Sequence, residues 1–171
     1  DGYLQAIREV CDRHGIVLIC DEVMAGFGRT GRWFACEHWD VVPDIITTAK
    51  GINSGYVPLG AMTVRPWVYD RIKDGFFAGG LTYSGHPLAC ASAVASIEAF
   101  REEGIVENAA EHGSFLADAL PALAERHPSI GEVRGLGLFW GLELVKDRET
   151  REPLSPFNAT SEPMQKLTKA A

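Results

Sequence analysis

The sequence predicts an α/β fold with a mostly parallel sheet. Three short apolar runs follow one another at 16–20, 45–49 and 59–64, and helical patterns lie before, between and after them. Unbroken apolar runs are typical of strands covered on both faces of a parallel sheet, and helices that alternate with strands are typical of α/β domains. With 171 residues, of which 46% are hydrophobic and 23% charged, the chain is long and apolar enough to build such a core.

The first predicted unit is a helix followed by a strand. Leu4, Ile7, Val10 and Cys11 follow the three-and-four spacing that marks the inner face of a helix. Gly15 is placed to end this helix. The apolar run 16–20 follows directly and predicts a strand buried on both faces.

The next elements continue the alternation. A strand is predicted at 45–49 after Pro43-Asp44, and another at 59–64, which stops before Pro66. One or two helical turns are expected at 33–38, and a helix at 67–73.

The second half of the chain changes from helices to strands. Pro87 suits the first turn of a helix at 88–103, and a further helix is predicted at 106–127 with a bend or break at Pro121. Strands follow at 130–134 and 138–145, and 161–163 has the pattern of a helix start. We place a domain change near Gly104, which gives domains at 1–104 and 105–171.

Charge and cysteine content exclude several classes of protein. The net charge is −7, and the chain has no cluster of Lys and Arg, so a nucleic-acid partner is not expected. No apolar run has the length of a membrane helix, and no basic region precedes an apolar stretch at the start. The four cysteines form no C-x-x-C pair, which favours reduced thiols in a cytoplasmic protein and gives no reason to expect a metal.

Polar side chains follow two of the predicted strands. Asp21 and Glu22 come directly after the first run, and Lys50 comes after the second. Ligands of open α/β sheets bind at the carboxyl ends of strands, so an acid and an amine would face one cleft. A partly desolvated lysine there is a nucleophile toward carbonyl groups. A lysine in a salt bridge at the end of a strand is the alternative.

The segment Gly26-Phe27-Gly28-Arg29-Thr30-Gly31 matches the G-x-G-x-x-G pattern of dinucleotide-binding proteins. A true fingerprint sits at the strand end, opens a full helix and is followed about twenty residues later by an acid. This segment starts five residues beyond Asp21 and leads to a short helix only. A nucleotide-binding module is therefore an alternative of low weight.

The chain is similar to one known family along most of its length, up to about residue 145. These segments carry the resemblance, in the family's order: Asp21-Glu22-Val23-Met24-Ala25-Gly26-Phe27-Gly28-Arg29-Thr30-Gly31, Phe34-Ala35-Cys36-Glu37-His38, Pro43-Asp44-Ile45, Ala49-Lys50-Gly51, Pro58-Leu59-Gly60-Ala61, Thr82-Tyr83-Ser84-Gly85-His86-Pro87 and Val133-Arg134-Gly135-Leu136-Gly137-Leu138. Together they resemble the class III aminotransferases that use pyridoxal 5'-phosphate (PLP). The resemblance implies the large domain of PLP fold type I and part of a small α+β C-terminal domain.

The resemblance implies roles for three residues of the first domain. Lys50 matches the lysine that binds PLP covalently and later moves a proton at the substrate α-carbon, so that one residue is both nucleophile and base. Asp21 matches the aspartate that keeps the pyridine nitrogen protonated, which lets the ring accept electrons. Val23 matches the small apolar residue that packs on the ring; a place in the ordinary core is compatible with that role.

Two further matches are less direct. Thr82 matches a threonine that reaches the cofactor phosphate from the neighbouring subunit, which implies a homodimer or a dimer of dimers. A helix-capping threonine is the alternative. Glu22 matches a glutamate that lies close to the cofactor site and supports its architecture, and a solvated or salt-bridged glutamate is the alternative.

One residue departs from the pattern. Met24 stands where many members have a glutamine that approaches the cofactor, and an apolar residue there resembles the ω-amino acid and amine:pyruvate branch. The family's phosphate cup and its carboxylate-binding arginine are expected outside this chain, before Asp1 and after Ala171.

The resemblance implies an enzyme that moves an amino group from an ω-amino acid or amine to a 2-oxo acid such as pyruvate by a ping-pong mechanism. A related PLP enzyme, such as a decarboxylase, aminomutase or racemase, is an alternative. A non-catalytic piece that serves only assembly is another.

Overall fold

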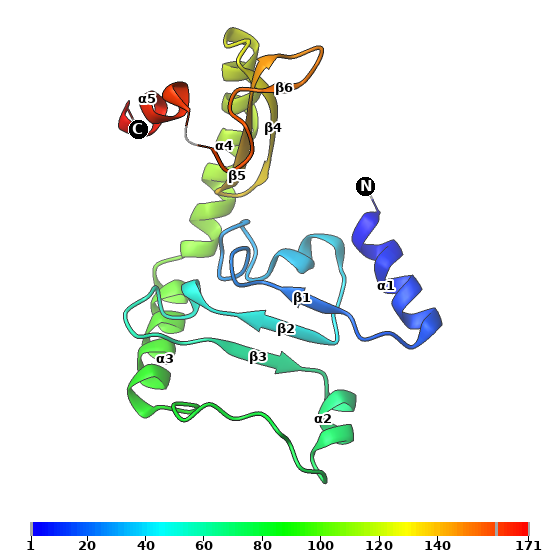
Figure 1. The fold of residues 1–171 in the computed structure, drawn as a ribbon. Helices are drawn as coiled ribbons and strands as arrows, with labels where there is room; N and C mark the ends of the chain where they lie inside the picture. The colour runs from blue at the N-terminus through cyan, green and yellow to red at the C-terminus, as the bar shows by residue number, and fades with distance from the viewer. Residues whose placement is uncertain (1, 160, 171) are drawn as a thin grey trace.

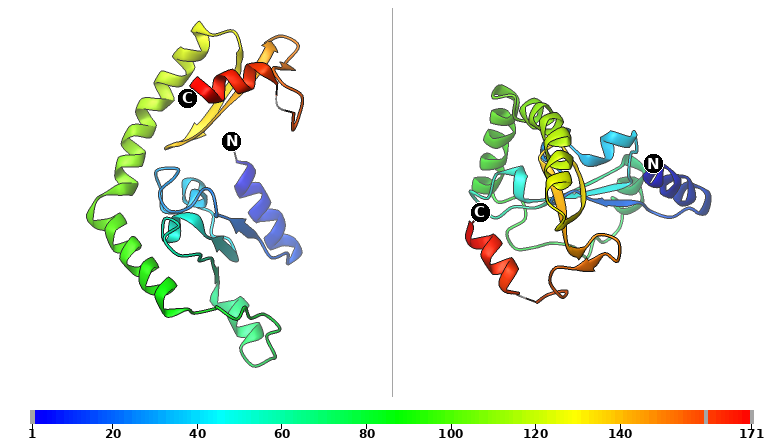
Figure 2. Two further views of the ribbon diagram at one scale, coloured as in Figure 1. Left: turned by 60° about the vertical axis from the view of Figure 1, so that its left-hand side comes forward. Right: turned by 90° about the horizontal axis from the view of Figure 1, so that it is seen from above.

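The chain folds into two lobes that a pair of successive helices connects. The structure is a computed structural model and describes residues 2–159 and 161–170. Figure 2 shows the first lobe around one small sheet and the second lobe around another, with the helices running along one side of both. The predicted α/β class is confirmed by this arrangement.

The first sheet has the strand order β1-β2-β3 (Figure 1). Strands β1 (Ile19–Asp21) and β2 (Ile45–Thr48) are parallel, with Ile19 opposite Ile45 and Asp21 opposite Thr47. Strand β3 (Ala61–Val64) is antiparallel to β2. The parallel pair is the part of the sheet that matters for function, because the two strands end at the same edge.

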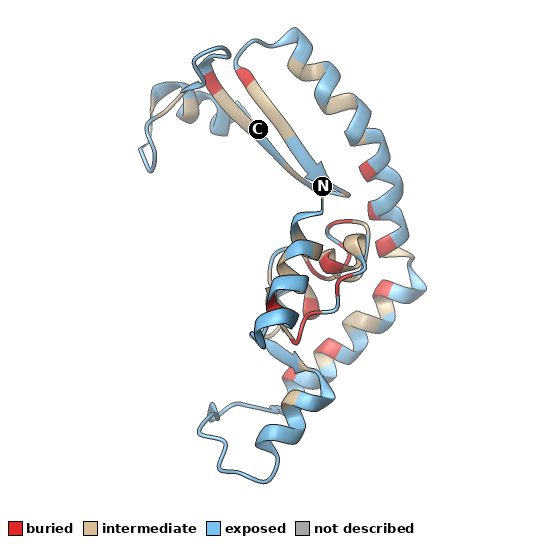
Figure 3. Ribbon diagram, turned by 90° about the vertical axis from the view of Figure 1, so that its right-hand side faces the viewer, coloured by how far each residue is buried: buried red, intermediate tan, exposed pale blue. Residues whose placement is uncertain are grey.

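Helix α1 (Tyr3–His14) packs against the segment that precedes β1 and ends at Gly15, which has φ 63°. Cys11 packs with Leu18 and Val41 in a small core, and Leu4 and Ile7 lie against it. The prediction that the run 16–20 is buried on both faces is wrong: Ile16, Val17 and Ile19 are 52%, 42% and 57% exposed, and Leu18 alone is buried. Helix α1 packs on Leu18 but leaves the other residues of the run partly or largely open to solvent. Figure 3 shows much of the first lobe as exposed.

Asp44 fastens several elements of the first lobe together. Its carboxylate accepts hydrogen bonds from the backbone N–H of Leu18, from Arg8 of α1 and from the indole of Trp67 in α2 (Pro66–Ile72). Burial by itself would raise the pKa of Asp44. The hydrogen bonds from Leu18, Arg8 and Trp67 outweigh burial and hold the pKa below its usual value.

Two long helices lead from the first lobe to the second. Helix α3 (Pro87–Glu102) begins with a proline in its first turn, and α4 (Ile105–Arg126) follows after Gly104, which has φ 62°. Helix α4 continues through Pro121, so the predicted break there is wrong. Pro121 lies on the exposed side of the helix, and packing of α4 against the second sheet supports the turns around it.

The second lobe is built on a β-hairpin. Strands β4 (Ile130–Leu136) and β5 (Phe139–Asp147) are antiparallel and meet at a tight turn, and the short β6 (Glu152–Pro153) pairs with β5. Helix α4 packs along β4. The predicted helix start at 161–163 is the beginning of α5 (Glu162–Ala170).

Two expectations from composition can be compared with the described residues. None of their helices combines the length and the apolar character needed to cross a membrane. The four cysteines are all free thiols, and Cys11 and Cys36 are buried.

Candidate active site

The parallel strands β1 and β2 bring Asp21 and Lys50 to one edge of the sheet. Asp21 is the last residue of β1 and lies opposite Thr47, and the backbone N–H of Glu22 donates to the carbonyl of Thr47 at 2.9 Å. Lys50 follows β2 after a single residue, Ala49. The predicted placement of the acid and the amine at the ends of adjacent strands is therefore what the register produces.

Asp21 presents its carboxylate to solvent in an ordered position. Its Oδ1 accepts the backbone N–H of Val23 at 3.0 Å, which fixes the side chain against the turn that follows β1. Among the described residues, Oδ2 has no hydrogen-bond partner. Val23 is half-buried and Met24 is 50% exposed. One carboxylate oxygen of Asp21 is thus free to bind a cationic group of a ligand.

Lys50 stands on an unusual backbone conformation. Its φ is 46°, in the left-handed region that residues with a side chain rarely adopt. It begins the short 3-10 helix η2 (Lys50–Ile52), and its side chain is exposed. Lys73, Lys146 and Lys166 form ion pairs, whereas Lys50 forms none within the described part of the chain. The alternative of a salt-bridged lysine has no support here.

Asn53 holds the loop after Lys50, and the sequence analysis did not identify it. It is 1% exposed, its Nδ2 donates to the carbonyl of Val57 at 2.6 Å, and its Oδ1 accepts the N–H of Gly55 at 3.3 Å. A single Asn in a glycine-containing loop gives only a weak signal in sequence, because Asn is common in turns of every kind.

Glu22 turns away from the edge where Asp21 and Lys50 lie. It is 3% exposed, and its two carboxylate oxygens accept the backbone N–H groups of Ala35 and Cys36 at 3.0 and 2.9 Å. These N–H groups open the 3-10 helix η1 (Ala35–Trp39). Burial, reinforced by the charge of Glu22, raises the pKa of the Cys36 thiol to about 12. Both oxygens are occupied, so Glu22 supports the architecture near the site, and neither a solvated nor a salt-bridged side chain is found.

The glycine-rich segment 26–31 is a packing element. A Cβ at Gly31 would lie 2.9 Å from Cα of Ala110 in α4, and one at Gly28 would lie 3.2 Å from Val106. Gly137, at the β4–β5 turn, packs directly on the backbone of Thr30, and Leu138 donates its N–H to the carbonyl of Arg29. The segment opens no full helix. Gly28 and Gly31 pack on α4, whereas Gly26 packs on Glu22 and Phe34 within the first lobe. Nothing in this geometry favours the nucleotide-binding alternative.

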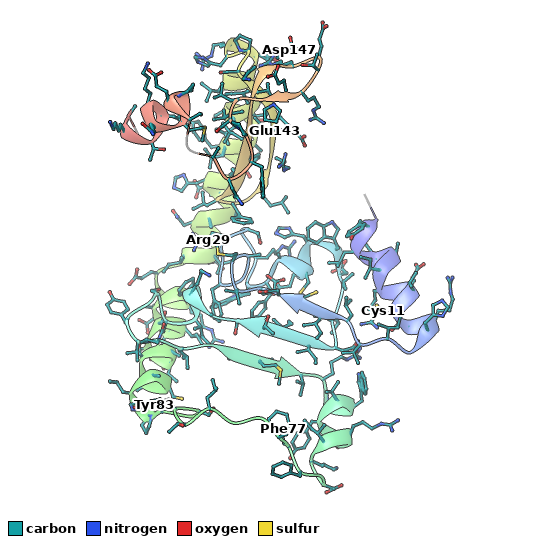
Figure 4. All side chains as sticks on the ribbon, in the orientation of Figure 1. Cys11, Arg29, Phe77, Tyr83, Glu143 and Asp147 are labelled. Atoms are coloured by element: carbon teal, nitrogen blue, oxygen red, sulfur yellow. The ribbon has the colours of Figure 1, made fainter. Side chains whose placement is uncertain are left out.

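Thr82 lies apart from these residues, on the stretch between α2 and α3. The side chain is exposed, and the surrounding turn is closed by hydrogen bonds from Leu81 N–H to Ser84 Oγ and from Ser84 N–H to Leu81 carbonyl. Figure 4 shows Phe77 and Tyr83 on this same stretch, at the margin of the first lobe. No contact within the described chain joins Thr82 to Asp21 or Lys50.

The described residues contain no candidate metal site. No group of three or more His, Cys, Asp or Glu side chains there has the arrangement to hold a metal ion.

Comparisons with known proteins identify the family. The model of the family "Aminotransferase class-III" matches residues 1–169. The chain is 42% identical to a taurine–pyruvate aminotransferase of Bilophila wadsworthia over 160 residues, which are 90% of this chain and 35% of that protein.

Solved structures agree with the family model. A taurine:2-oxoglutarate aminotransferase from Bifidobacterium kashiwanohense, solved with PLP and glutamate, superposes with a TM-score of 0.93 at 43% identity, over 99% of this chain and 38% of that one. An (S)-enantioselective omega-transaminase from Thermomicrobium roseum gives 0.86 at 45% identity, over 91% and 35%. The chain spans just over a third of the length of these relatives. It has the fold of the PLP fold type I transaminases, and it belongs to the class III aminotransferase family.

Proposed function

We propose that this chain is part of a PLP-dependent aminotransferase, which moves an amino group from an ω-amino acid or amine to a 2-oxo acid such as pyruvate. The observation that carries the proposal is the placement of Asp21 and Lys50 at the same edge of the parallel pair β1–β2. Family membership supports it, since the matching segments include both residues.

The residues present fit the cofactor. Asp21 has a carboxylate oxygen without a partner among the described residues, and Lys50 has an exposed amine outside any ion pair there. A protonated pyridine ring is held by an anion, and an aldehyde reacts with a free amine. The end of this sheet offers both groups. When bound, PLP supplies an electron-poor ring that accepts the electron pair released at the substrate α-carbon.

Each residue of the candidate site then has a defined role. The Asp21 carboxylate holds a proton on the ring nitrogen, and the hydrogen bond from Val23 N–H keeps that carboxylate in place. The Lys50 amine anchors the cofactor and afterwards carries the proton to and from the α-carbon. The side chain of Val23 packs on the ring. Glu22 contributes through the position of η1.

We also propose that the enzyme is a homodimer, or a dimer of dimers, in which Thr82 donates its hydroxyl to the cofactor phosphate of the partner subunit. The support is the exposed stretch that carries it, where Phe76 is 95%, Leu81 82% and Tyr83 78% exposed. Apolar side chains gathered on one segment are typical of protein interfaces. A helix-capping role for Thr82 has no hydrogen bond to support it among the described residues.

The relatives guide the choice of amino donor. Two of them act on taurine, by their names, and the amine of taurine lies at the end of the molecule opposite its acid group. This is the donor chemistry expected of the ω-amino acid branch. We propose a donor of this class, a cytoplasmic enzyme in keeping with its four free thiols, and a division at Gly104 between a cofactor-binding domain and a C-terminal domain.

The proposal is tested on the protein at its full natural length. Its visible absorption is recorded with added PLP before and after borohydride, and the modified lysine is located by peptide mass analysis. We expect a reduced adduct on Lys50 and none in Lys50→Ala, with Lys73→Ala as the control that keeps the adduct. An adduct on a different lysine, or no adduct, would refute the assignment.

A second assay separates the reaction from those of related enzymes. Amino transfer from taurine or a simple ω-amine to pyruvate is followed through the alanine formed, alongside carbon dioxide release. Alanine formation that requires pyruvate supports an aminotransferase, whereas carbon dioxide release without amino transfer would point to a decarboxylase.

A further inference from the structure

Two non-glycine residues beside the candidate site have left-handed backbones. Phe27 has φ 56° and Lys50 has φ 46°. Such conformations persist only where the surrounding structure enforces them, and they cluster at functional sites. Gly51 follows Lys50 directly and packs against Phe27: a Cβ on Gly51 would be 2.7 Å from Cβ of Phe27 and 3.4 Å from its Cγ. The side chain of Phe27 therefore occupies the space that a side chain at position 51 would need.

Neighbouring residues fix the position of Phe27. Its N–H donates to the carbonyl of Trp33 at 2.7 Å, and its ring packs edge-on against Phe34, Phe100 and Trp33 with centroids 5.7, 6.3 and 6.4 Å away. Phe100 belongs to α3 and is 8% exposed. Because aromatic side chains from two segments surround the ring, Phe27 cannot withdraw from Gly51 without disrupting this cluster. Loss of Phe34 alone would leave Trp33, Phe100 and the backbone hydrogen bond in place.

Lys50 is the link between two fixed segments. Upstream, β2 is paired on both sides, and Thr48 Oγ1 donates to the carbonyl of Ala61. Downstream, Gly51 lies under Phe27, while Ile52 is 8% and Asn53 1% exposed. Relaxation of Lys50 to the ordinary right-handed region would require Gly51 to move relative to β2, and Phe27 occupies the space beside Gly51.

We propose that Phe27 is a positioning residue for Lys50: by filling the space over Gly51, it holds the Lys50 backbone in the left-handed conformation from which the amine serves the site. The inference rests on the proposed function of Lys50 and assigns a task to a residue of the G-x-G-x-x-G segment. Phe27 itself need not touch the cofactor or the substrate, because it acts on Lys50 through Gly51.

The test compares variants of the full-length enzyme. Phe27→Gly removes the whole contact and suits the positive φ at this position, and Phe27→Tyr keeps the ring. Phe34→Ala is the matched control, because Phe34 packs on Phe27 and is absent from the atoms nearest to a Cβ on Gly51. The readouts are the pH midpoint of the visible absorption of the PLP-loaded protein and the fraction of chains with borohydride-fixed PLP on Lys50, at a PLP concentration that half-saturates the wild type.

We expect Phe27→Gly to lower the Lys50-linked fraction about tenfold, in keeping with the free energy of a left-handed residue, and to shift the pH midpoint. Phe27→Tyr should have the wild-type Lys50-linked fraction and pH midpoint. Phe34→Ala should also have wild-type values of both, even if its thermal midpoint falls as far as that of Phe27→Gly. Unchanged labelling and pH midpoint in Phe27→Gly would overturn the proposal, while a wild-type adduct away from Lys50 would instead overturn the proposed function.

Two further variants keep the test decisive if Phe27→Gly does not fold. Phe27→Leu retains Cβ and Cγ but lacks the flat ring, so its pH midpoint should shift in the same direction by a smaller amount, and an unshifted midpoint would refute the role. Gly51→Ala should reduce Lys50 labelling and shift the pH midpoint, because its Cβ would lie 2.7 Å from Cβ of Phe27. Unchanged labelling and pH midpoint in Gly51→Ala would also refute the role.

Discussion

The guanidinium of Arg8 donates to Oδ2 of Asp44 at 2.8 Å, and the Asp44 side chain is 4% exposed. The same carboxylate accepts Leu18 N–H at 2.8 Å and Trp67 Nε1 at 3.2 Å. One buried side chain thus joins α1, the residue that precedes β1, and α2. The strand that delivers Asp21 to the site depends on this junction.

Replacement of Asp44 by Asn is expected to lower the free energy of unfolding by about 3 kcal/mol, because it removes the buried counter-charge of Arg8. Arg8 then retains only its ion pair with the exposed carboxylate of Asp12. The pKa of Asp44 lies below its ordinary 3.8 in the folded protein. The stabilisation from its charge is therefore complete above pH values near 4 and is lost as the pH falls through the folded pKa. Thermal midpoints of both proteins, measured from pH 7 down to pH 2.5, should differ most at neutral pH and converge in acid.

Asp70→Asn is the control for this experiment. Asp70 pairs with Lys73 at 2.8 Å, but the two side chains are 59% and 41% exposed. Exposed pairs contribute little, so its thermal midpoint should stay close to that of the wild type. A similar loss in both variants would show that Asp44 has no special role.

Asp21→Asn is expected to reduce kcat by about 10²- to 10³-fold, the range for removal of one charge that stabilises a transition state. Asn keeps an oxygen that can accept the N–H of Val23, so the turn after β1 should keep its shape. PLP content, measured by absorbance after release in alkali, should change far less than kcat. A variant with full activity would exclude Asp21 from the chemistry.

Glu22→Gln is expected to destabilise the protein by about 1–3 kcal/mol, because an amide offers one acceptor where the carboxylate offers two to Ala35 and Cys36. Glu22 also helps to raise the pKa of Cys36, so the Cys36 thiol should ionise at lower pH in this variant. Alkylation of Cys36 as a function of pH, followed by peptide mass analysis, measures that shift. An unchanged profile would contradict the contact between Glu22 and η1.

Gly137→Ala is expected to disrupt the contact between the lobes. Gly137 has φ 56°, and a Cβ there would collide with the backbone of Thr30 and Gly31, which cannot move without the whole 26–31 segment. The substitution should cost at least about 3 kcal/mol, in the range of severe overpacking, and should lower the thermal midpoint and the yield of folded protein.

Gly141→Ala tests the same hairpin without the collision. A Cβ at Gly141 would have its nearest neighbour, Arg134, 3.9 Å away. We expect this variant to have a wild-type thermal midpoint. If both alanine variants were equally stable, the close contact between Gly137 and Thr30 would be contradicted.

The elements of the chain could be predicted well from local patterns, with instructive exceptions. Glycine and proline positions predicted the ends of α1 and α3 and the start of α3. The burial of the run 16–20 was predicted wrongly at Ile16, Val17 and Ile19, because an apolar residue type does not say whether a neighbouring element covers its face. Pro121 did not break α4, since packing on β4 outweighs a local preference.

The candidate site shows the same contrast between features that local patterns predict and features that depend on tertiary contacts. Asp21 and Lys50 could be identified because polar residues at strand ends are visible in the sequence, and the register of β1 and β2 places them at one edge. Glu22 could be identified as a neighbour of the site, but its orientation toward η1 could not, since that follows from backbone N–H groups thirteen and fourteen residues away. Phe27 could not be identified for the same reason, whereas the contacts of Asn53 are local and gave a weak signal because Asn is common in turns of every kind.

By itself, the sequence determined the α/β class, the order of the elements and the pair of residues that carries the proposed chemistry, because hydrophobic periodicity and strand-end polarity are local properties. Only the tertiary structure decided which glycines serve contacts between the lobes, which way Glu22 turns, and that Lys50 stands on a left-handed backbone against Phe27 and Gly51. These depend on segments far apart in the chain meeting at van der Waals distance, and no pattern of neighbouring residues records such a meeting.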